Sequence, residues 1–260
     1  MQTSLVIDHI TNWLSEYNQR AGTTGFVVGV SGGIDSAVTS TLVANTGLPV
    51  LCLEMPIHQS SDQVSRAMEH IEWLKLNHPN VRMESIELTE IFDRFIDAVP
   101  VSMDKNRDMA LVNTRARIRM TALYYFASLE SKLVAGTGNK GEDFGIGFYT
   151  KYGDGGVDLS PIADLNKSEV YAVGKELGII ESIMVAPPTD GLWGDDRTDE
   201  DQIGASYAEL EWAMDYSGDE SGLSARETEV LSIYRRLNKM NRHKMEPIPV
   251  CQIPDSLKDS

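Results

Sequence analysis

The strongest constraint on the fold is an apolar run that leads into a glycine turn and a helix. It reads Phe26-Val27-Val28-Gly29-Val30-Ser31-Gly32-Gly33-Ile34-Asp35-Ser36. Residues 26–30 have the length and β-branched content of a buried parallel strand, and residues 37–44 favour a helix. This arrangement points backbone N–H groups and a helix N-terminus at an anion. We therefore expect a phosphate-binding loop at the end of a strand.

The loop differs from a Walker A loop, because it has no lysine where that motif places one. Asp35 would repel a phosphate unless a divalent cation lay between them, so the loop implies Mg²⁺. A plain glycine turn in which Asp35 caps the helix is the alternative interpretation. The complete sequence SGGIDS favours the phosphate loop.

The composition indicates one globular domain that binds no nucleic acid. A chain of 260 residues is long enough to bury a core. Its formal net charge of -16 opposes the basic face that nucleic acid requires. Cys52 and Cys251 are far apart and form no CxxC pair, so neither a disulfide framework nor a zinc site is expected. Without a basic leader or an apolar run of about 18 residues, we expect a cytoplasmic protein without a membrane span.

Strand and helix patterns alternate along the chain. Further strands are expected at 49–53, 81–88 and 132–135, and helices at 3–20, 61–76, 89–98 and 108–128. Another helix should begin at a cap formed by Asn166 or Ser168 and end near Gly178. This rhythm predicts an α/β fold with a doubly wound parallel sheet. In such a sheet, ligands lie beyond the carboxyl ends of the strands. We expect a single domain over residues 1–260, with an N-terminal helix in 1–22, an α/β core at 23–190 and a helical part with a tail at 200–260.

Two later segments carry further candidate site residues. Residues 136–142 form a second glycine-rich turn at a strand end, and residues 144–156 contain five glycines interleaved with aromatic residues. The latter segment is too rich in glycine for the interior of an element and too aromatic for a linker, so we expect a folded binding loop. On the helix at 108–128, Arg117 should face away from Arg115 and Arg119, because two residues turn a helix by about 200°.

An acidic stretch follows at residues 190–201, with five aspartates, one glutamate and Trp193. It is either a solvated connection or a lid that closes over the substrates. Two helices, at 200–216 and 224–239, are expected to form the C-terminal part.

With these motifs identified, the chain resembles known enzymes. The SGGIDS loop resembles that of the ATP pyrophosphatases, which transfer AMP to an acceptor and release pyrophosphate. The stretch TKYGDGGVDLSPIADLNK is more specific, and with it the chain resembles the ammonia-dependent NAD synthetases. That resemblance implies a five-stranded parallel sheet, a homodimer and the adenylation of deamido-NAD by ATP, after which ammonia displaces AMP to give NAD.

The resemblance also implies roles for individual residues. Asp35 and Glu142 would bind Mg²⁺, while Asp35, Lys167 and Thr189 would be catalytic. ATP would contact Gly29, Val30, Ser31, Gly32, Gly33, Ile34, Asp35, Ser36, Thr137, Lys167 and Thr189. Deamido-NAD would contact Arg117, Lys151, Asp158, His243 and Lys244. One departure is Glu54, which stands where many members of the family carry an arginine that contacts the nucleotide.

Two other functions use similar loops. A tRNA-modifying enzyme of the same superfamily usually carries cysteine pairs or a basic extension, and this chain has neither. A nucleotide sensor without catalysis would not need two separated acids for a metal, whereas Asp35 and Glu142 are both present. The sequence therefore favours the ligase.

Overall fold

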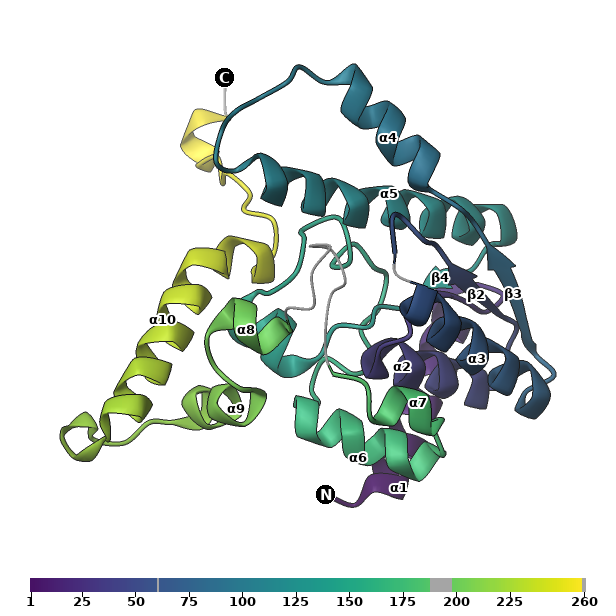
Figure 1. Ribbon diagram of the computed structural model, residues 1–260, viewed down its shortest axis with the longest axis horizontal. Coiled ribbons are helices and arrows are strands. Elements are labelled where there is room, and N and C mark those ends of the chain that lie inside the picture. Colours follow the sequence, from purple (N-terminus) through teal and green to yellow (C-terminus); the bar gives the residue numbers. More distant parts are fainter. Residues whose placement is uncertain (60, 188–197, 259–260) are drawn as a thin grey trace.

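A computed structural model of the chain describes residues 1–59, 61–187 and 198–258. Its centre is a parallel sheet with the strand order β3-β2-β1-β4. The strands are β1 (Phe26–Gly29), β2 (Val50–Glu54), β3 (Val81–Ser85) and β4 (Leu133–Val134). The expected doubly wound α/β architecture is confirmed, with helices on both faces of the sheet (Figure 1).

The register of the strands brings the predicted loops to one edge. Phe26 lies opposite Val50 and Leu133, and Gly29 lies opposite Leu53. Because all strands run parallel, the segments that follow β1, β2 and β4 emerge at the same edge. The glycine turn after β1 therefore lies between the ends of β2 and β4.

The described residues form four strands, so the expectation of a fifth is corrected. In its place, Leu159 makes a single parallel bridge with Ala135. The side chain of Asp158 accepts a hydrogen bond from the Val134 N–H at 2.8 Å, where a fifth strand would offer a carbonyl. Pro161 has no N–H with which to extend the ladder. The fifth position is thus reduced to one bridge.

Helices cover the two faces of the sheet unequally (Figure 1). On one side lie α1 (Thr3–Ala21), α2 (Ile34–Asn45), α3 (Ser61–Asn77), α6 (Lys167–Leu177) and α7 (Glu181–Met184). On the other lie α4 (Thr89–Ala98) and α5 (Arg107–Glu130). Helix α2 is buried on nearly all sides because α6 packs closely on it at Gly174, where an added Cβ would lie 2.9 Å from Ile34.

The C-terminal part packs around Ile146 as a separate apolar cluster. It contains the π-helix η1 (Lys140–Ile146) and the helices α8 (Asp199–Ile203), α9 (Tyr207–Asp215) and α10 (Ala225–Met245). The single helix expected at 200–216 is two helices, because Gly204 ends α8 at φ 85° and Ser206 caps α9. Residues 140–146, expected as turn and loop, form η1 instead. The sequence patterns also missed α7 and the short helices η2 (Glu220–Gly222) and η3 (Asp255–Leu257).

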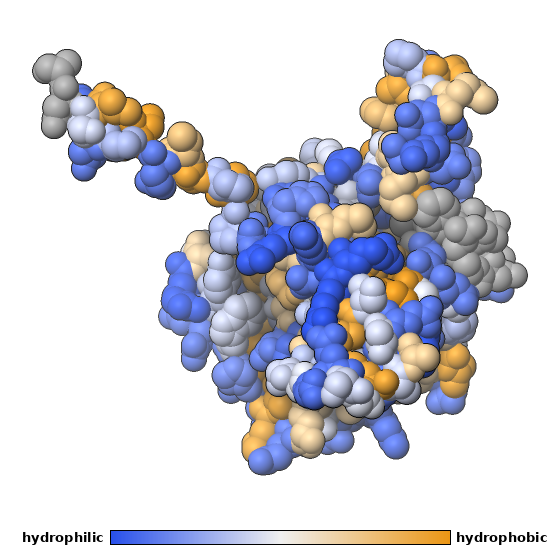
Figure 2. Space-filling model, turned by 90° about the vertical axis from the view of Figure 1, so that its left-hand side faces the viewer, coloured by the Kyte–Doolittle hydropathy of each residue, from blue (hydrophilic) through white to orange (hydrophobic). Residues whose placement is uncertain are grey.

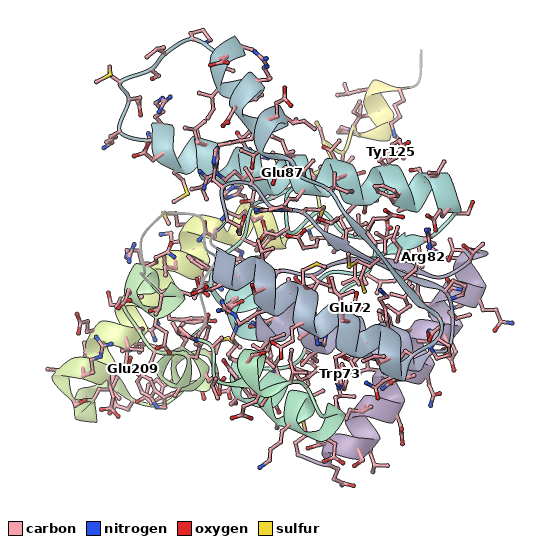
Figure 3. The ribbon with its side chains drawn as sticks, turned by 45° about the vertical axis from the view of Figure 1, so that its right-hand side comes forward. Glu72, Trp73, Arg82, Glu87, Tyr125 and Glu209 are labelled. Carbon is pink, nitrogen blue, oxygen red and sulfur yellow. The ribbon has the colours of Figure 1, made fainter. Side chains whose placement is uncertain are left out.

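Exposed apolar side chains are spread over the surface, and the C-terminal segment and α5 carry some of them. Residues 246–258 are exposed and extend from the body as an arm, which Figure 2 shows. Tyr125 points outward from α5 in Figure 3 and is 62% exposed. Within the described ranges, no helix is long and apolar enough to span a membrane.

His70 is a buried titratable group between α2 and α3. Its Nε2 lies 2.9 Å from the Ser40 hydroxyl, and its ring stacks on Trp73. Burial lowers the pKa of His70 to about 4 from its ordinary value of 6.5. The folded protein therefore binds fewer protons than the unfolded chain between these pH values.

This burial predicts a loss of stability in acid. The contribution of His70 to the free energy of unfolding is complete above pH 6.5 and falls by about 3 kcal/mol as the pH approaches 4. Urea unfolding of the wild type and His70→Gln, from pH 7.5 to 4.5, measures it. The wild type should lose stability more steeply than the variant, whose amide does not titrate. Parallel curves would contradict the prediction.

Candidate active site

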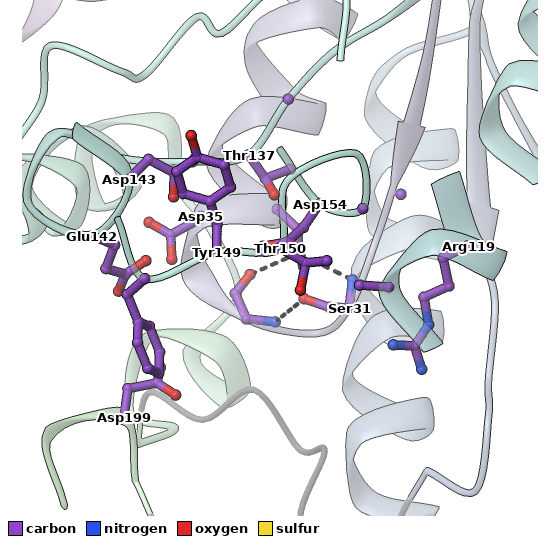
Figure 4. A pocket seen from close by; sticks show the side chains of 18 of the residues that line it. Ser31, Asp35, Arg119, Thr137, Glu142, Asp143, Tyr149, Thr150, Asp154 and Asp199 are labelled. Atoms are coloured by element: carbon purple, nitrogen blue, oxygen red, sulfur yellow. Dashed lines mark hydrogen bonds between the residues drawn. The ribbon is translucent and has the colours of Figure 1, made fainter. Parts of the chain in front are cut away.

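The candidate site is a cavity of about 610 Å³ at the carboxyl edge of the sheet. Its wall includes the turns after β1, β2 and β4 and part of α10. This volume is within the range of sites that hold drug-sized ligands. Figure 4 shows Asp35, Glu142 and Thr137 around it, with Arg119 at the other end.

The turn after β1 is built to present backbone N–H groups. Gly32 has φ 82°, and a Cβ there would lie 2.8 Å from the Gln63 carbonyl, so glycine is required. The Ser36 hydroxyl donates to the Gly33 carbonyl at 2.9 Å and accepts from the Ser31 N–H at 3.2 Å. Gly33 is the N-cap of α2 and has no side chain to satisfy the first N–H groups of the helix. These groups remain available to an anion.

Lys167 joins the two acids that the sequence separates by more than 100 residues. Its ammonium donates to Asp35 Oδ2 at 2.6 Å and to Glu142 Oε1 at 2.9 Å. Asp35 is in the first turn of α2, Glu142 is in η1 and Lys167 begins α6. The lysine is 4% exposed, whereas the side chains of Asp35 and Glu142 are 19% and 14% exposed, so the ammonium is buried and the two carboxylates remain partly accessible from the cavity.

One ammonium balances only one of these two carboxylates. Burial opposes the charge of Lys167, but Asp35 and Glu142 override it and hold the pKa of the ammonium above its ordinary value. Burial raises the pKa of Glu142, and the nearby Asp35 raises it further against the effect of Lys167. When both carboxylates are ionised, the cluster therefore carries one more negative than positive charge, which a proton on Glu142 or a second cation would neutralise.

Three neighbours hold the cluster and were not predicted from the sequence. The buried Asn139 donates to Asp35 Oδ1 at 3.1 Å and accepts from the Glu142 N–H at 3.0 Å. The Tyr207 hydroxyl donates to Glu142 and lies 3.2 Å from Asp199, and burial raises its pKa so that it keeps its proton. An asparagine directly before a helix is a typical N-cap and would have marked Asn139. Tyr207 comes from the distant helix α9 and gave no local signal, whereas Asp199, at the start of α8, lies in the acidic stretch 190–201 for which a lid was one of two interpretations.

A second acidic region of the cavity contains Asp143 and Asp154. Burial raises the pKa of Asp143 well above its ordinary value, and Asp154 raises it further. Asp154 lines the cavity, and loss of solvation by the protein around it raises its pKa as well. Its carboxylate accepts a hydrogen bond from the Thr150 N–H at 3.0 Å. Lys244 is close enough to favour the ionised forms of both acids. Asp143 was not among the residues expected at the site.

The predicted ATP contacts lie largely together. The cavity wall includes residues 29–36, Thr137 and Lys167. Thr189 and most of the acidic stretch 190–201 lie outside the described residues, and of that stretch only 198–201 are described, at the start of α8.

The residues predicted to contact deamido-NAD are dispersed. Lys244 lines the cavity and donates to the carbonyls of Gly147 and Tyr149, each at 2.8 Å. Three of the others are linked by hydrogen bonds outside the cavity. Arg117 donates to the Lys151 carbonyl, and the Lys151 ammonium donates to the His243 carbonyl at 2.7 Å. Asp158 is held on β4 by Tyr124 and the Val134 N–H.

Arg119 is a cavity residue to which the sequence gave no role. Its Nε donates to the Met55 carbonyl at 2.9 Å and its Nη2 to Gln59 at 2.6 Å. Burial, followed by repulsion from Arg115, lowers its pKa to about 10. Arg117 instead contacts the Lys151 carbonyl, as expected for a residue that faces away from Arg119.

Comparison with known proteins gives a consistent result. A model of the NAD synthase family matches residues 6–248. The NH(3)-dependent NAD(+) synthetase of Methanosarcina mazei is 36% identical, over 95% of this chain and 97% of that protein. The enzyme of the same name from Carboxydothermus hydrogenoformans is 34% identical, over 91% and 93% of the two chains.

Solved structures share the fold. The NMN synthetase of Francisella tularensis superposes with a TM-score of 0.85 at 30% identity, covering 97% of this chain and 100% of that one. The NH3-dependent NAD synthetase of Campylobacter jejuni has a TM-score of 0.77 at 26% identity, with the same coverage.

The ion cluster predicts a specific pattern of stability changes. Lys167→Met leaves two carboxylates without their cation and should lower the free energy of unfolding by about 3–5 kcal/mol. Asp35→Asn combined with Lys167→Met removes one of the stranded charges and should recover part of that loss. Urea unfolding at pH 8 measures both. Equal losses in the single and double variants would show that the charges do not interact as described.

Proposed function

Because this chain belongs to the NAD synthase family, we propose that it is an ammonia-dependent NAD synthetase, an ATP-dependent carbon–nitrogen ligase that forms AMP. It activates the nicotinate carboxylate of deamido-NAD with ATP, releases pyrophosphate and then joins ammonia to the activated acyl group. The observation that carries this proposal is the Lys167 ammonium between Asp35 and Glu142, beside the uncapped N-terminus of α2.

The chemistry requires these residue types. A carboxylate is a poor acyl donor and must first become a mixed anhydride with AMP. The acceptor carboxylate and the α-phosphate are both negative, so their approach needs cations. Lys167 supplies one positive charge next to the turn after β1, whose N–H groups hold the departing pyrophosphate. Ammonia is itself the nucleophile of the second step, so the protein needs no serine or cysteine nucleophile.

The acids suit Mg²⁺ as the second cation. In the described part of the chain, no three or more His, Cys, Asp or Glu side chains are placed so that they could together hold a metal ion. Mg²⁺ is, however, usually held by one or two carboxylates together with substrate phosphates and water. Asp35 and Glu142 supply two carboxylates with a surplus negative charge, so the residues fit. When bound, Mg²⁺ neutralises phosphate charge, and Asp35 and Glu142 are the side chains that would hold it.

The outer residues complete the proposal. Lys244 lines the cavity, and Arg117, Lys151 and His243 lie outside it next to the same segment, where the four would meet the phosphates of a deamido-NAD molecule that extends beyond the cavity. Asp158 would accept hydrogen bonds from the same ligand, and Thr189 would contact ATP. We further propose that the active form is a homodimer whose dinucleotide site lies at the subunit interface, in the cytoplasm.

A second candidate acceptor is the corresponding mononucleotide. The Francisella tularensis structure, with the TM-score of 0.85, is described as an NMN synthetase. The purified protein should therefore be offered deamido-NAD and nicotinate mononucleotide in parallel, each with ATP, Mg²⁺ and ammonium. Faster turnover of deamido-NAD supports the first candidate, and faster turnover of the mononucleotide supports the second.

The role of Asp35 can be tested with a substitution that keeps the size of its side chain. Asp35→Asn should reduce pyrophosphate release at least about a hundredfold, because it removes a cation ligand that stabilises phosphate charge. Asp164→Asn is the matched control, since this carboxylate is fully exposed. Wild-type turnover of Asp35→Asn at saturating Mg²⁺ would show that the residue does not act on the nucleotide.

The nitrogen source gives a separate prediction. Cys52 is buried in β2 and Cys251 lies on the exposed tail, so neither lines the cavity to act as a glutaminase nucleophile. Glutamine should therefore not replace ammonium. The assay is NAD formation in ammonia-free buffer with each nitrogen donor. NAD made from glutamine by the purified chain would refute this part of the proposal.

A further inference from the structure

Glu54 is a buried carboxylate whose charge the proposed chemistry does not use. It is the last residue of β2, is 4% exposed and lines the cavity. The Ser85 hydroxyl donates to its Oε2 at 2.7 Å. No described residue donates to Oε1, so one oxygen of a fixed carboxylate remains for a ligand. Burying a carboxylate with incomplete hydrogen bonding is costly, and a ligand that donates to it would offset the cost.

The position of Glu54 relates it to the nucleoside of ATP. Its strand neighbours β1, and the Val30 N–H donates to the carbonyl of Leu53, directly before Glu54. Glu142 and Lys167 approach the turn after β1 from the opposite side, beyond β4. An ATP molecule with its phosphates at that turn and at these two residues therefore extends its nucleoside toward β2. This step rests on the proposed use of ATP.

The chemistry of a carboxylate limits which part of ATP it can meet. An ionised carboxylate accepts hydrogen bonds and donates none, so it would repel a phosphate and attract a hydroxyl or an amine. In doubly wound dinucleotide folds, an acid about 20 residues after the glycine turn binds the ribose hydroxyls. Glu54 follows the turn by about that number and ends the strand next to β1.

We propose that Glu54 accepts hydrogen bonds from the ribose hydroxyls of ATP and thereby selects ribonucleotides over deoxyribonucleotides. Ser85 is the positioning residue, because its hydroxyl fixes the second carboxylate oxygen. Arg119 is within electrostatic range of Glu54 and ties down the segment that follows β2, through Met55 and Gln59. Among the described residues Glu54 has no ion pair, so Arg119 favours its charge from a distance without occupying its free oxygen.

The test compares ATP with 2′-deoxy-ATP and 3′-deoxy-ATP in kcat/KM and in binding measured by calorimetry. The wild type should prefer ATP over at least one of the two deoxynucleotides by roughly tenfold to a hundredfold, as expected for a hydrogen bond to a charged group. Glu54→Gln keeps a neutral acceptor and should retain part of the preference, whereas Glu54→Ala should nearly abolish it. The change should appear in KM and in Kd more than in kcat. Glu84→Gln, an exposed acid on the adjacent strand, is the matched control.

The outcomes separate this inference from the proposed function. If the wild type binds ATP but both Glu54 variants keep its preference, the inference is wrong while the ligase proposal stands. Equal losses of kcat/KM with ATP and with both deoxynucleotides, in variants whose circular dichroism matches the wild type, would also overturn the inference. ITP lacks the adenine amine, so a preference for ATP over ITP that disappears in Glu54→Ala would assign the carboxylate to the base and contradict ribose recognition. Failure of the wild type to bind ATP at all would instead reject the proposed function.

Discussion

The Lys167 ammonium and the two carboxylates that it contacts connect three parts of the molecule. Asp35 comes from the helix after β1, Glu142 from the π-helix after β4, and Lys167 from the start of α6. Withdrawn from water, each of these charges would be costly alone, so the site exists only while the three segments are docked together. Asn139 then donates to the second oxygen of Asp35, and Tyr207 donates to the same Glu142 oxygen that Lys167 contacts. The same contacts thus support the fold and assemble the cavity.

The surplus of negative charge in this cluster explains how a strongly acidic protein can bind an anionic nucleotide. One ammonium cannot neutralise Asp35 and Glu142 together. Burial raises the pKa of Glu142, and the negative charge of Asp35 raises it further. A divalent cation that arrives with ATP would meet both the carboxylates and the phosphates. The uncapped N-terminus of α2 adds N–H groups on the phosphate side. The net charge of -16 therefore opposes nucleic-acid binding without opposing nucleotide binding.

Local sequence signals predicted the parts of the structure that depend on local physics. The turn after β1 was predictable because glycines and hydroxyls are required at fixed spacing, and the parallel sheet because its buried strands are short apolar runs. The prediction of a fifth strand was wrong, because the side chain of Asp158 accepts the Val134 N–H that such a strand would bind. The break between α8 and α9 depends on Gly204 and the Ser206 cap, which a helical pattern averaged over many residues conceals. Tyr207 reaches the cavity through tertiary packing alone, so no motif could mark it, while Asp199 was marked only as one acid of the stretch 190–201 and not by its contact with Tyr207.

The central claim is that Asp35 and Glu142 form one cation site that serves the phosphates of ATP. It is tested most directly by anomalous X-ray diffraction from crystals grown with Mn²⁺ and an ATP analogue that resists cleavage between the α and β phosphates. We expect one anomalous peak from Mn²⁺, in contact with carboxylate oxygens of both Asp35 and Glu142 and with phosphate oxygens. A metal bound to the phosphates but remote from Asp35 and Glu142, with Lys167 still bridging them, would contradict it.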